Sequence, residues 1–152
     1  MKTIKTADCV SAYNILKDSS LGKMSGADKI NVIKTIKSIK GVAEDFIAFR
    51  TDASERLRGD NHDEMTAKAT KWQTDGDDAL TYDEKVAVNG YFNKYGEELK
   101  QCVDEELNRE HEVDVRTIAE DAFCLLLEAN DNLSAEQALS LHDMLVSEET
   151  EK

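Results

Sequence analysis

The sequence predicts a mainly α-helical protein: a long antiparallel helical hairpin with a short two-stranded β ribbon at its base and two short C-terminal helices. Two stripes of residues spaced 4-3-4-3 lead to this prediction, because that spacing marks one face of a long helix. The absence of proline from the 152 residues also favours uninterrupted helices. The first stripe comprises Val32, Ile36, Ile39, Ala43, Phe46, Arg50, Ala53 and Leu57, and the second comprises Val88, Phe92, Tyr95, Leu99 and Cys102.

The first stripe lies on a helix whose two ends are marked in the sequence. Ser25 and Asp28 have the spacing of a capping box, in which side chains bond the free backbone N–H groups of a helix start. The helix should run to about Leu57, and Gly59 follows at the position where a helix-ending glycine is expected.

Polar residues 59–80 separate the stripes, and we expect them to form the tip of the hairpin, with only a helical turn over residues 65–72. Thr81 and Glu84 form a second capping box. They predict the start of the second long helix, which should extend to about Arg109.

Two segments outside the hairpin have the character of strands. Residues 111–117 alternate between apolar and polar side chains, and residues 1–5 do so weakly. As the only two candidates, they should pair and tie the N-terminal segment to the base of the hairpin. A short helix should follow the first strand, from Thr6 as its cap to about Asp18.

Two further capping boxes predict the C-terminal helices. Thr117 and Glu120 should open an apolar helix that breaks at residues 130–132, and Ser134 and Gln137 should open the last helix. The chain is therefore expected to form a single helical domain over residues 1–146, followed by a disordered acidic tail over residues 147–152.

The net charge of −13 is unevenly distributed, since residues 1–40 carry eight lysines and only three aspartates. In an antiparallel hairpin, the four lysines on the first long helix would face acids of the second helix at positions 98 and 104–106. These lysines are Lys29, Lys34, Lys37 and Lys40. The same alignment places Arg50 near Asn89, Ala43 near Tyr95, and Arg56 and Arg58 near Asp83 and Glu84. Opposite charges would then select the register. An acidic chain of this kind is not expected to bind nucleic acid through a general phosphate-binding surface.

No motif for catalysis, metal binding or cofactor binding stands out, so no enzyme activity and no cofactor are expected. The histidines lack the spacing of zinc or di-iron sites and are expected on the surface. The Asp-rich segment 75–78 lacks the later ligands of a calcium loop. Arg58-Gly59-Asp60 matches an adhesion tripeptide, but matches this short are common by chance. The three cysteines should be reduced and mostly buried.

Trp72 is the strongest candidate for a contact with another protein. It is the only tryptophan and lies in the polar tip beside Lys68 and Lys71, so it could anchor a partner. The alternative is that it packs the tip back on itself. The surplus of apolar residues near the C-terminus must likewise cover the hairpin base or meet a partner. The apolar residues of this region that are candidates for a contact with a partner are Leu126, Leu141 and Met144.

The order of these parts resembles a group of small, uncharacterised tailed-bacteriophage proteins with a strand–helix–hairpin–strand–helix layout. The residues that carry the resemblance are Met1-Lys2-x-Ile4-Lys5, Phe46-x-x-Phe49-Arg50, Tyr91 to Leu99, Asn108 to Val115 and Leu133 to Glu136. The resemblance implies a phage origin and a place among virion or assembly proteins, but it carries over no functional residues. The Trp-containing tip and the acidic tail depart from the pattern.

Together these features favour a non-enzymatic phage structural protein: a subunit of the capsid, the connector ring or the tail. It would pack against other phage structural proteins or copies of itself, in the host cytoplasm during assembly and then in the virion, with no membrane contact. One alternative is an acidic mimic of nucleic acid that inhibits a host DNA-binding protein, because residues 41–152 carry a net charge of −18. A further alternative is a phage assembly chaperone.

Overall fold

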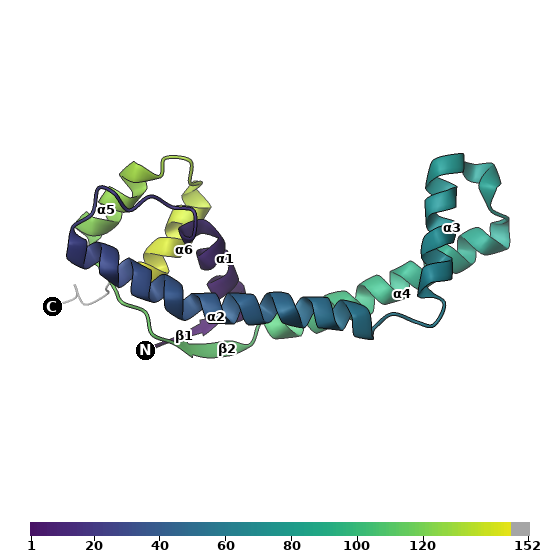
Figure 1. The fold of residues 1–152 in the computed structure, drawn as a ribbon, viewed down its shortest axis with the longest axis horizontal. Helices are drawn as coiled ribbons and strands as arrows, with labels where there is room; N and C mark the ends of the chain where they lie inside the picture. The colour runs from purple at the N-terminus through teal and green to yellow at the C-terminus, as the bar shows by residue number, and fades with distance from the viewer. Residues whose placement is uncertain (147–152) are drawn as a thin grey trace. The chain divides into compact units, whose positions relative to one another are not determined.

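The computed structural model describes residues 1–146 and is mainly helical with one two-stranded antiparallel sheet, which confirms the predicted fold class (Figure 1). The expected tail, residues 147–152, lies outside the described residues. In chain order the elements are β1 (Lys2–Lys5), α1 (Thr6–Leu16), α2 (Gly26–Arg56), α3 (His62–Asp75), the short 3-10 helix η1 (Asp77–Ala79), α4 (Tyr82–Leu107), β2 (Glu110–Val113), α5 (Glu120–Ala129) and α6 (Ala135–Leu145).

The described chain forms two compact units. Unit 1 contains Met1–Ile47 and the described residues from Leu107 onward, and unit 2 contains Ala48–Glu106. Helix α2 contributes its first six or so turns to unit 1 and its last turns to unit 2. That residues 1–146 fold as a single domain stays a prediction.

In unit 1, the two strands pair as the sequence predicts. β1 runs antiparallel to β2, with Lys5 opposite Glu110 and Ile4 opposite His111. The predicted capping role of Thr6 is wrong. Its buried hydroxyl instead contacts the carbonyl oxygen of Arg109 at 3.3 Å and Nε2 of His111 at 2.7 Å, because the chain turns directly from strand into helix at this corner.

The core of unit 1 is formed by apolar side chains from α1, the first part of α2, β2, α5 and α6. They include Cys9, Leu16, Val32, Ile39, Val113, Phe123, Leu126, Leu141 and Leu145. Burial of this size is the main favourable contribution to folding. The buried apolar positions on α2 belong to the heptad stripe, and this confirms the predicted inward face of that helix.

Side-chain hydrogen bonds hold the segment after β2 against α2. The fully buried Thr35 accepts a bond from the backbone N–H of Arg116 at 2.8 Å, and Ser38 accepts one from the backbone N–H of Asp114 at 3.0 Å. Because residues 114–117 belong to no regular element, their backbone groups have to be satisfied in this way.

Asn130, at the C-terminal end of α5, likewise satisfies the backbone groups of a loop. Its side chain donates to the carbonyl oxygens of Ser20 and Leu126, each at 2.8 Å, and accepts from the N–H of Ser20 at 2.7 Å. The sequence marks Asn130 only as a helix breaker. In the structure it also fixes the loop after α1.

Three of the four predicted capping boxes mark true helix starts. In each, the side chain of the first residue accepts a bond from the backbone N–H three residues later. The pairs are Ser25 with Asp28, Thr81 with Glu84, and Ser134 with Gln137.

The capping box predicted at Thr117 is wrong. The residue preceding α5 is Ala119, which makes no side-chain cap. Ile118 donates its N–H to the carbonyl oxygen of Leu145 at 2.8 Å and forms a parallel bridge with Val146. This pairing keeps the chain extended beyond the point at which the helix was expected to start.

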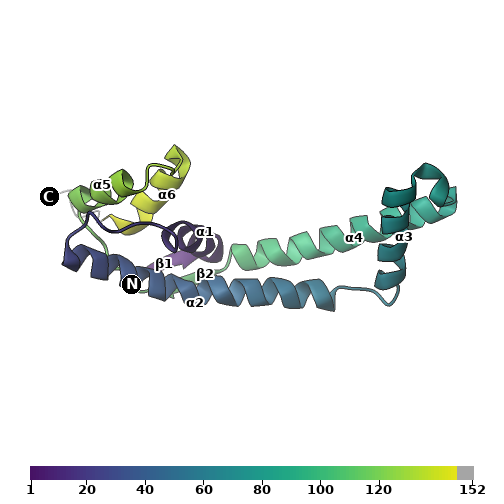
Figure 2. The ribbon, with the colours of Figure 1, turned by 45° about the horizontal axis from the view of Figure 1, so that its top comes forward.

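In unit 2, the tip is a helix rather than a polar loop. α3 spans 14 residues and folds against the beginning of α4 (Figures 1 and 2). It ends at Gly76, whose φ of 89° is disfavoured for residues with a side chain and whose N–H bonds the carbonyl oxygen of Trp72. The predicted helical turn over residues 65–72 was too short, because α3 begins at His62, whose half-buried side chain extends the helical face of Met65, Ala69 and Trp72 by one turn.

The predicted register of the hairpin is also wrong. Tyr95 contacts Ser54, about three helical turns along α2 from the expected Ala43. Arg56 reaches Cys102 rather than Asp83. The reason is that α3 occupies the beginning of α4, so the end of α2 meets α4 only from Tyr91 onward.

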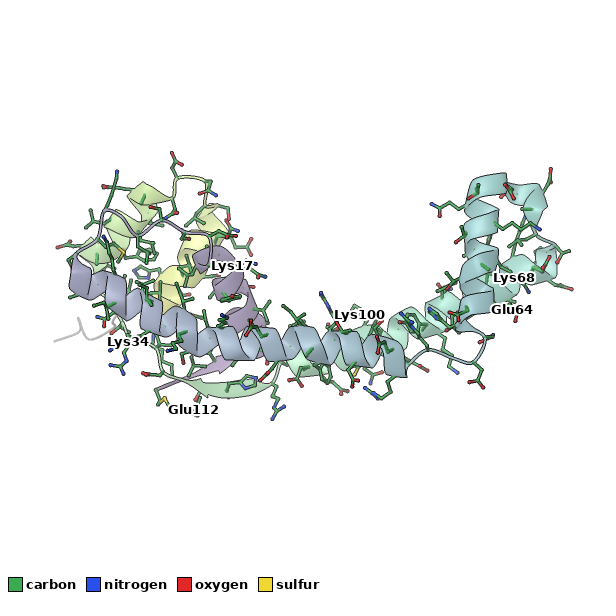
Figure 3. The ribbon with its side chains drawn as sticks, viewed as in Figure 1. Lys17, Lys34, Glu64, Lys68, Lys100 and Glu112 are labelled. Atoms are coloured by element: carbon green, nitrogen blue, oxygen red, sulfur yellow. The ribbon has the colours of Figure 1, made fainter. Side chains whose placement is uncertain are left out.

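Two lysines of α2 have a different neighbour from the one predicted. Lys34 and Lys37 lie with Ser38 and Asp114 around a shallow depression, beside the segment that follows β2 (Figure 3 labels Lys34). Exposed charge pairs contribute only ~0–1 kcal/mol each, so they did not determine the register.

Two leucines of α6 provide a matched test of the core of unit 1. Leu141 is fully buried, whereas Leu139 is 63% exposed. Leu141→Ala should lower the free energy of unfolding by about 2–5 kcal/mol, because it leaves a cavity. Leu139→Ala should change it by less than about 0.5 kcal/mol. Denaturant unfolding followed by circular dichroism measures both, and equal effects would contradict the packing.

Candidate protein-contact site

The candidate site lies in unit 2, where α3 meets the beginning of α4. The Lys68 ammonium group lies 3.2 Å from a carboxylate oxygen of Glu64 and 3.8 Å from one of Glu84, so it links the two helices (Figure 3 labels Lys68 and Glu64). Lys71 is exposed on the same helix. A backbone hydrogen bond from Thr81, aided by these two lysines, lowers the pKa of Glu84.

Trp72 packs the tip on itself, which was one of the two alternatives for this residue. Its indole Nε1–H donates to Asp77 at 3.0 Å, and the ammonium group of Lys85 lies 5.6 Å from its ring centroid. The ring is half-buried, so one side remains accessible. Its role as a contact for another protein stays a prediction.

A shallow hollow of about 400 Å³ adjoins the Trp72 ring. Its walls come from α3, η1 and α4 and mix apolar side chains with amides and one acid, Asp77. They include Ala69, Trp72, Val88, Asn89 and Phe92. Such a mixture suits a contact with a protein side chain better than tight binding of an ion.

Tyr82 and Val86 are an exposed apolar pair that the sequence analysis did not single out. They are one turn apart on α4, with 79% and 52% of their surfaces exposed. Because both lie outside the heptad stripe, the periodicity placed them on the polar face. The signal that could have identified them is an apolar i, i+4 pair on that face.

The three C-terminal contact candidates are not on the surface of the described chain. Leu126 and Leu141 are completely buried and Met144 is 7% exposed. They belong to the core of unit 1, so of the two alternatives for this apolar surplus, packing within the chain is the one observed.

A cluster of aromatic rings around His62 was also missed. The imidazole lies within 5.3–6.1 Å, centroid to centroid, of Tyr91, Phe92 and Tyr95. Its Nδ1 is 2.6 Å from the Tyr91 hydroxyl, and Tyr95 donates to the carbonyl oxygen of Ser54 at 2.8 Å. The expectation that the histidines are surface residues is not confirmed, because all three are half-buried.

Gly59 has a different role from the predicted one. Its backbone is not in the left-handed region, which among the described residues only Gly76 adopts. Its N–H donates to the Tyr91 hydroxyl at 3.2 Å, and a Cβ here would lie 3.1 Å from the side chain of Asn61 and 3.4 Å from the Tyr91 ring. Close approach to Tyr91, rather than helix termination, explains this glycine.

The three cysteines are free thiols in different surroundings. Cys9 is buried, and burial raises its pKa to about 11, so it is inert at neutral pH. Cys102 is half-buried and Cys124 is exposed, so the prediction that most are buried is wrong. Within the described residues, no group of acids, histidines and cysteines is placed to hold a metal ion. No described helix is both long and apolar enough to cross a membrane.

Comparison with known proteins found no protein-family model, no curated protein and no solved structure that matches the chain. The interpretation of the site therefore depends on its own geometry.

The hydroxyl of Tyr91 provides a test of the aromatic cluster. Tyr91→Phe leaves the Gly59 N–H and His62 without this partner and should lower the free energy of unfolding by about 1–3 kcal/mol. Tyr82→Phe removes an equivalent hydroxyl from an exposed ring and should have little effect. Thermal unfolding of both variants tests this, and equal stability would show that the cluster contributes nothing.

The start of α4 should respond to pH through Glu84. Because its pKa is lowered in the folded chain, ionised Glu84 stabilises the fold above the ordinary glutamate pKa of about 4.3, and this contribution is lost as the pH falls through the lowered value. The Thr81 amide resonance should therefore titrate with a midpoint below about 4.3. Glu84→Gln keeps the cap but should remove that titration. If the Thr81 resonance still titrates in the variant, another group causes the titration.

Proposed function

We propose that this protein is a non-enzymatic bacteriophage structural or assembly protein that binds other proteins through the tip of unit 2. The contact surface would comprise the accessible side of Trp72, the adjoining hollow, and the exposed pair Tyr82 and Val86. Its partners would be other phage structural proteins or copies of this chain, in the host cytoplasm during assembly and then in the particle.

The observation that carries this proposal is the exposure of Tyr82 and Val86 on one face of α4. Tyrosine and tryptophan are enriched where proteins bind one another, because they combine a large apolar surface with a polar group. Lys68, Lys71 and Lys85 would add a charged rim to this surface. The phage origin is supported by the resemblance of the sequence pattern.

A second candidate function is inhibition of a host DNA-binding protein by mimicry of nucleic acid. The observation in its favour is that Glu97, Glu98 and Glu105 are exposed on α4 without an ion pair to any described residue. A complex with a host nuclease or polymerase that weakens steeply with salt would favour this candidate. An assembly chaperone would use the same contact surface but would be absent from the finished particle.

Mass spectrometry of particles and assembly intermediates, purified from cells infected with the phage that encodes this chain, tests the proposal. The protein should be present in one or both. Absence from all stages would exclude both the structural and the chaperone role, and presence only in intermediates would identify a chaperone.

Substitutions at the tip connect this outcome to the proposed surface. Tyr82→Ser with Val86→Ser should reduce incorporation at least about tenfold, since hot-spot side chains contribute about 2 kcal/mol or more each. Leu139→Ser, which changes an exposed leucine in unit 1, is the matched control and should leave incorporation unchanged. Equal incorporation of both variants would contradict the role of the tip.

A further inference from the structure

One edge of the β ribbon in unit 1 carries free backbone groups. The N–H of Thr6 donates to the carbonyl oxygen of Arg109 at 2.9 Å, next to the pair Lys5 and Glu110. Because antiparallel pairs alternate, Ile4 and Lys2 are the residues that exchange hydrogen bonds with β2. The N–H and C=O of Thr3 and the N–H of Lys5 consequently point away from β2.

These groups have no hydrogen-bond partner among the described residues. They border a groove of about 730 Å³ lined by β1, α1 and α6. Ala12 and Met144 give its inner wall apolar surface, and Asp8 and Asp143 add charge to the helical side. A free strand edge beside a groove of this size has the form of a site for an added strand.

We propose that an extended peptide segment of a partner protein binds in this groove as a third strand, paired with the free edge of β1. The proposal rests on the proposed protein-binding function and names the chemistry of one partner segment. Its backbone would bond Thr3 and Lys5, and alternate side chains would point toward α1 and α6.

The charges around the edge indicate which segment fits. Lys5 is exposed on the outer face of β1, and on its paired side it faces Glu110. An acidic residue opposite Lys5 would repeat that pairing, and a basic or apolar residue on the inner face would suit Asp8, Asp143 and the apolar wall.

A second copy of β1 fits less well. The strand reads Lys2-Thr3-Ile4-Lys5, and its outward backbone groups belong to Thr3 and Lys5, so antiparallel pairing with itself would place Thr3 of one copy opposite Lys5 of the other. That register gives Lys5 no acidic partner, and lysines on an edge strand commonly discourage pairing between copies.

The chain itself supplies a probe with the required pattern. In residues 108–115, Glu110 and Glu112 lie on one face of the strand and His111 and Val113 on the other. A synthetic peptide of this sequence should bind the intact protein, and a peptide with both glutamates replaced by lysine should bind at least about tenfold more weakly.

Nuclear magnetic resonance of the labelled full-length protein gives the readout. The peptide should shift the amide resonances of Thr3 and Lys5 and slow their hydrogen exchange, while the Ile4 amide, already bonded to β2, changes little. Absence of binding at millimolar peptide overturns the proposal. So does a large change at Ile4, since the peptide would then have replaced β2.

Variants at the edge separate backbone pairing from general attraction. Thr3→Pro removes the free N–H without removing a bond to β2 and should weaken peptide binding about tenfold or more. Thr3→Val keeps the N–H and should bind normally. Lys5→Gln should weaken binding of the acidic peptide and leave binding of the lysine-substituted peptide unchanged. If circular dichroism shows that the proline variant does not fold, this variant still tests the proposal.

The remaining outcomes are also decisive. If the Thr3 and Lys5 amides shift with protein concentration alone, together with dimerisation in sedimentation, the occupant is a second copy and the peptide proposal is wrong. Particle proteomics tests the proposed function separately, so the chain can be found in particles while the groove fails to bind peptide, and the two failures are distinguishable.

Discussion

The apolar stripe of α2 is the constraint on which the rest of the structure depends. Val32 and Ile39 lie in unit 1 and Ala53 in unit 2, and all three are almost completely buried. A stripe this long cannot be covered by one short neighbour, so two sets of elements share the task. In unit 1 they are the ribbon, α1, α5 and α6, and in unit 2 the neighbour is α4. The arrangement of both units follows from that division.

Buried polar side chains fix the loops that connect the apolar elements. Thr35 and Asn130 are buried, yet each has partners because each bonds the backbone of a segment without regular structure. Buried polar groups of this kind are costly when unpaired and specific when paired. They fix where the loops run, which apolar packing alone does not determine.

The sequence predicted local features such as helix starts correctly, but it did not predict contacts between residues far apart in the chain. Ser25, Thr81 and Ser134 mark helix starts correctly because capping depends on residues only three positions apart. The register of α2 against α4 was wrong because it was inferred from exposed charges, whereas the observed contact of Tyr95 with Ser54 is a packing and hydrogen-bonding contact. The half-exposed Trp72 was found by composition. The rings around His62 all lie on α4, but His62 lies on α3, so no sequence motif joins the histidine to them.

The division of the chain has a consequence for its synthesis on the ribosome. Unit 2 is one continuous stretch, whereas unit 1 combines Met1–Ile47 with residues that follow Leu107. The nascent chain can therefore fold unit 2 before β2, α5 and α6, against which β1 and α1 pack, have been translated. During that interval the apolar face of α1 and the stripe of α2 are uncovered, and early protection of this face by a chaperone or by rapid elongation would limit aggregation.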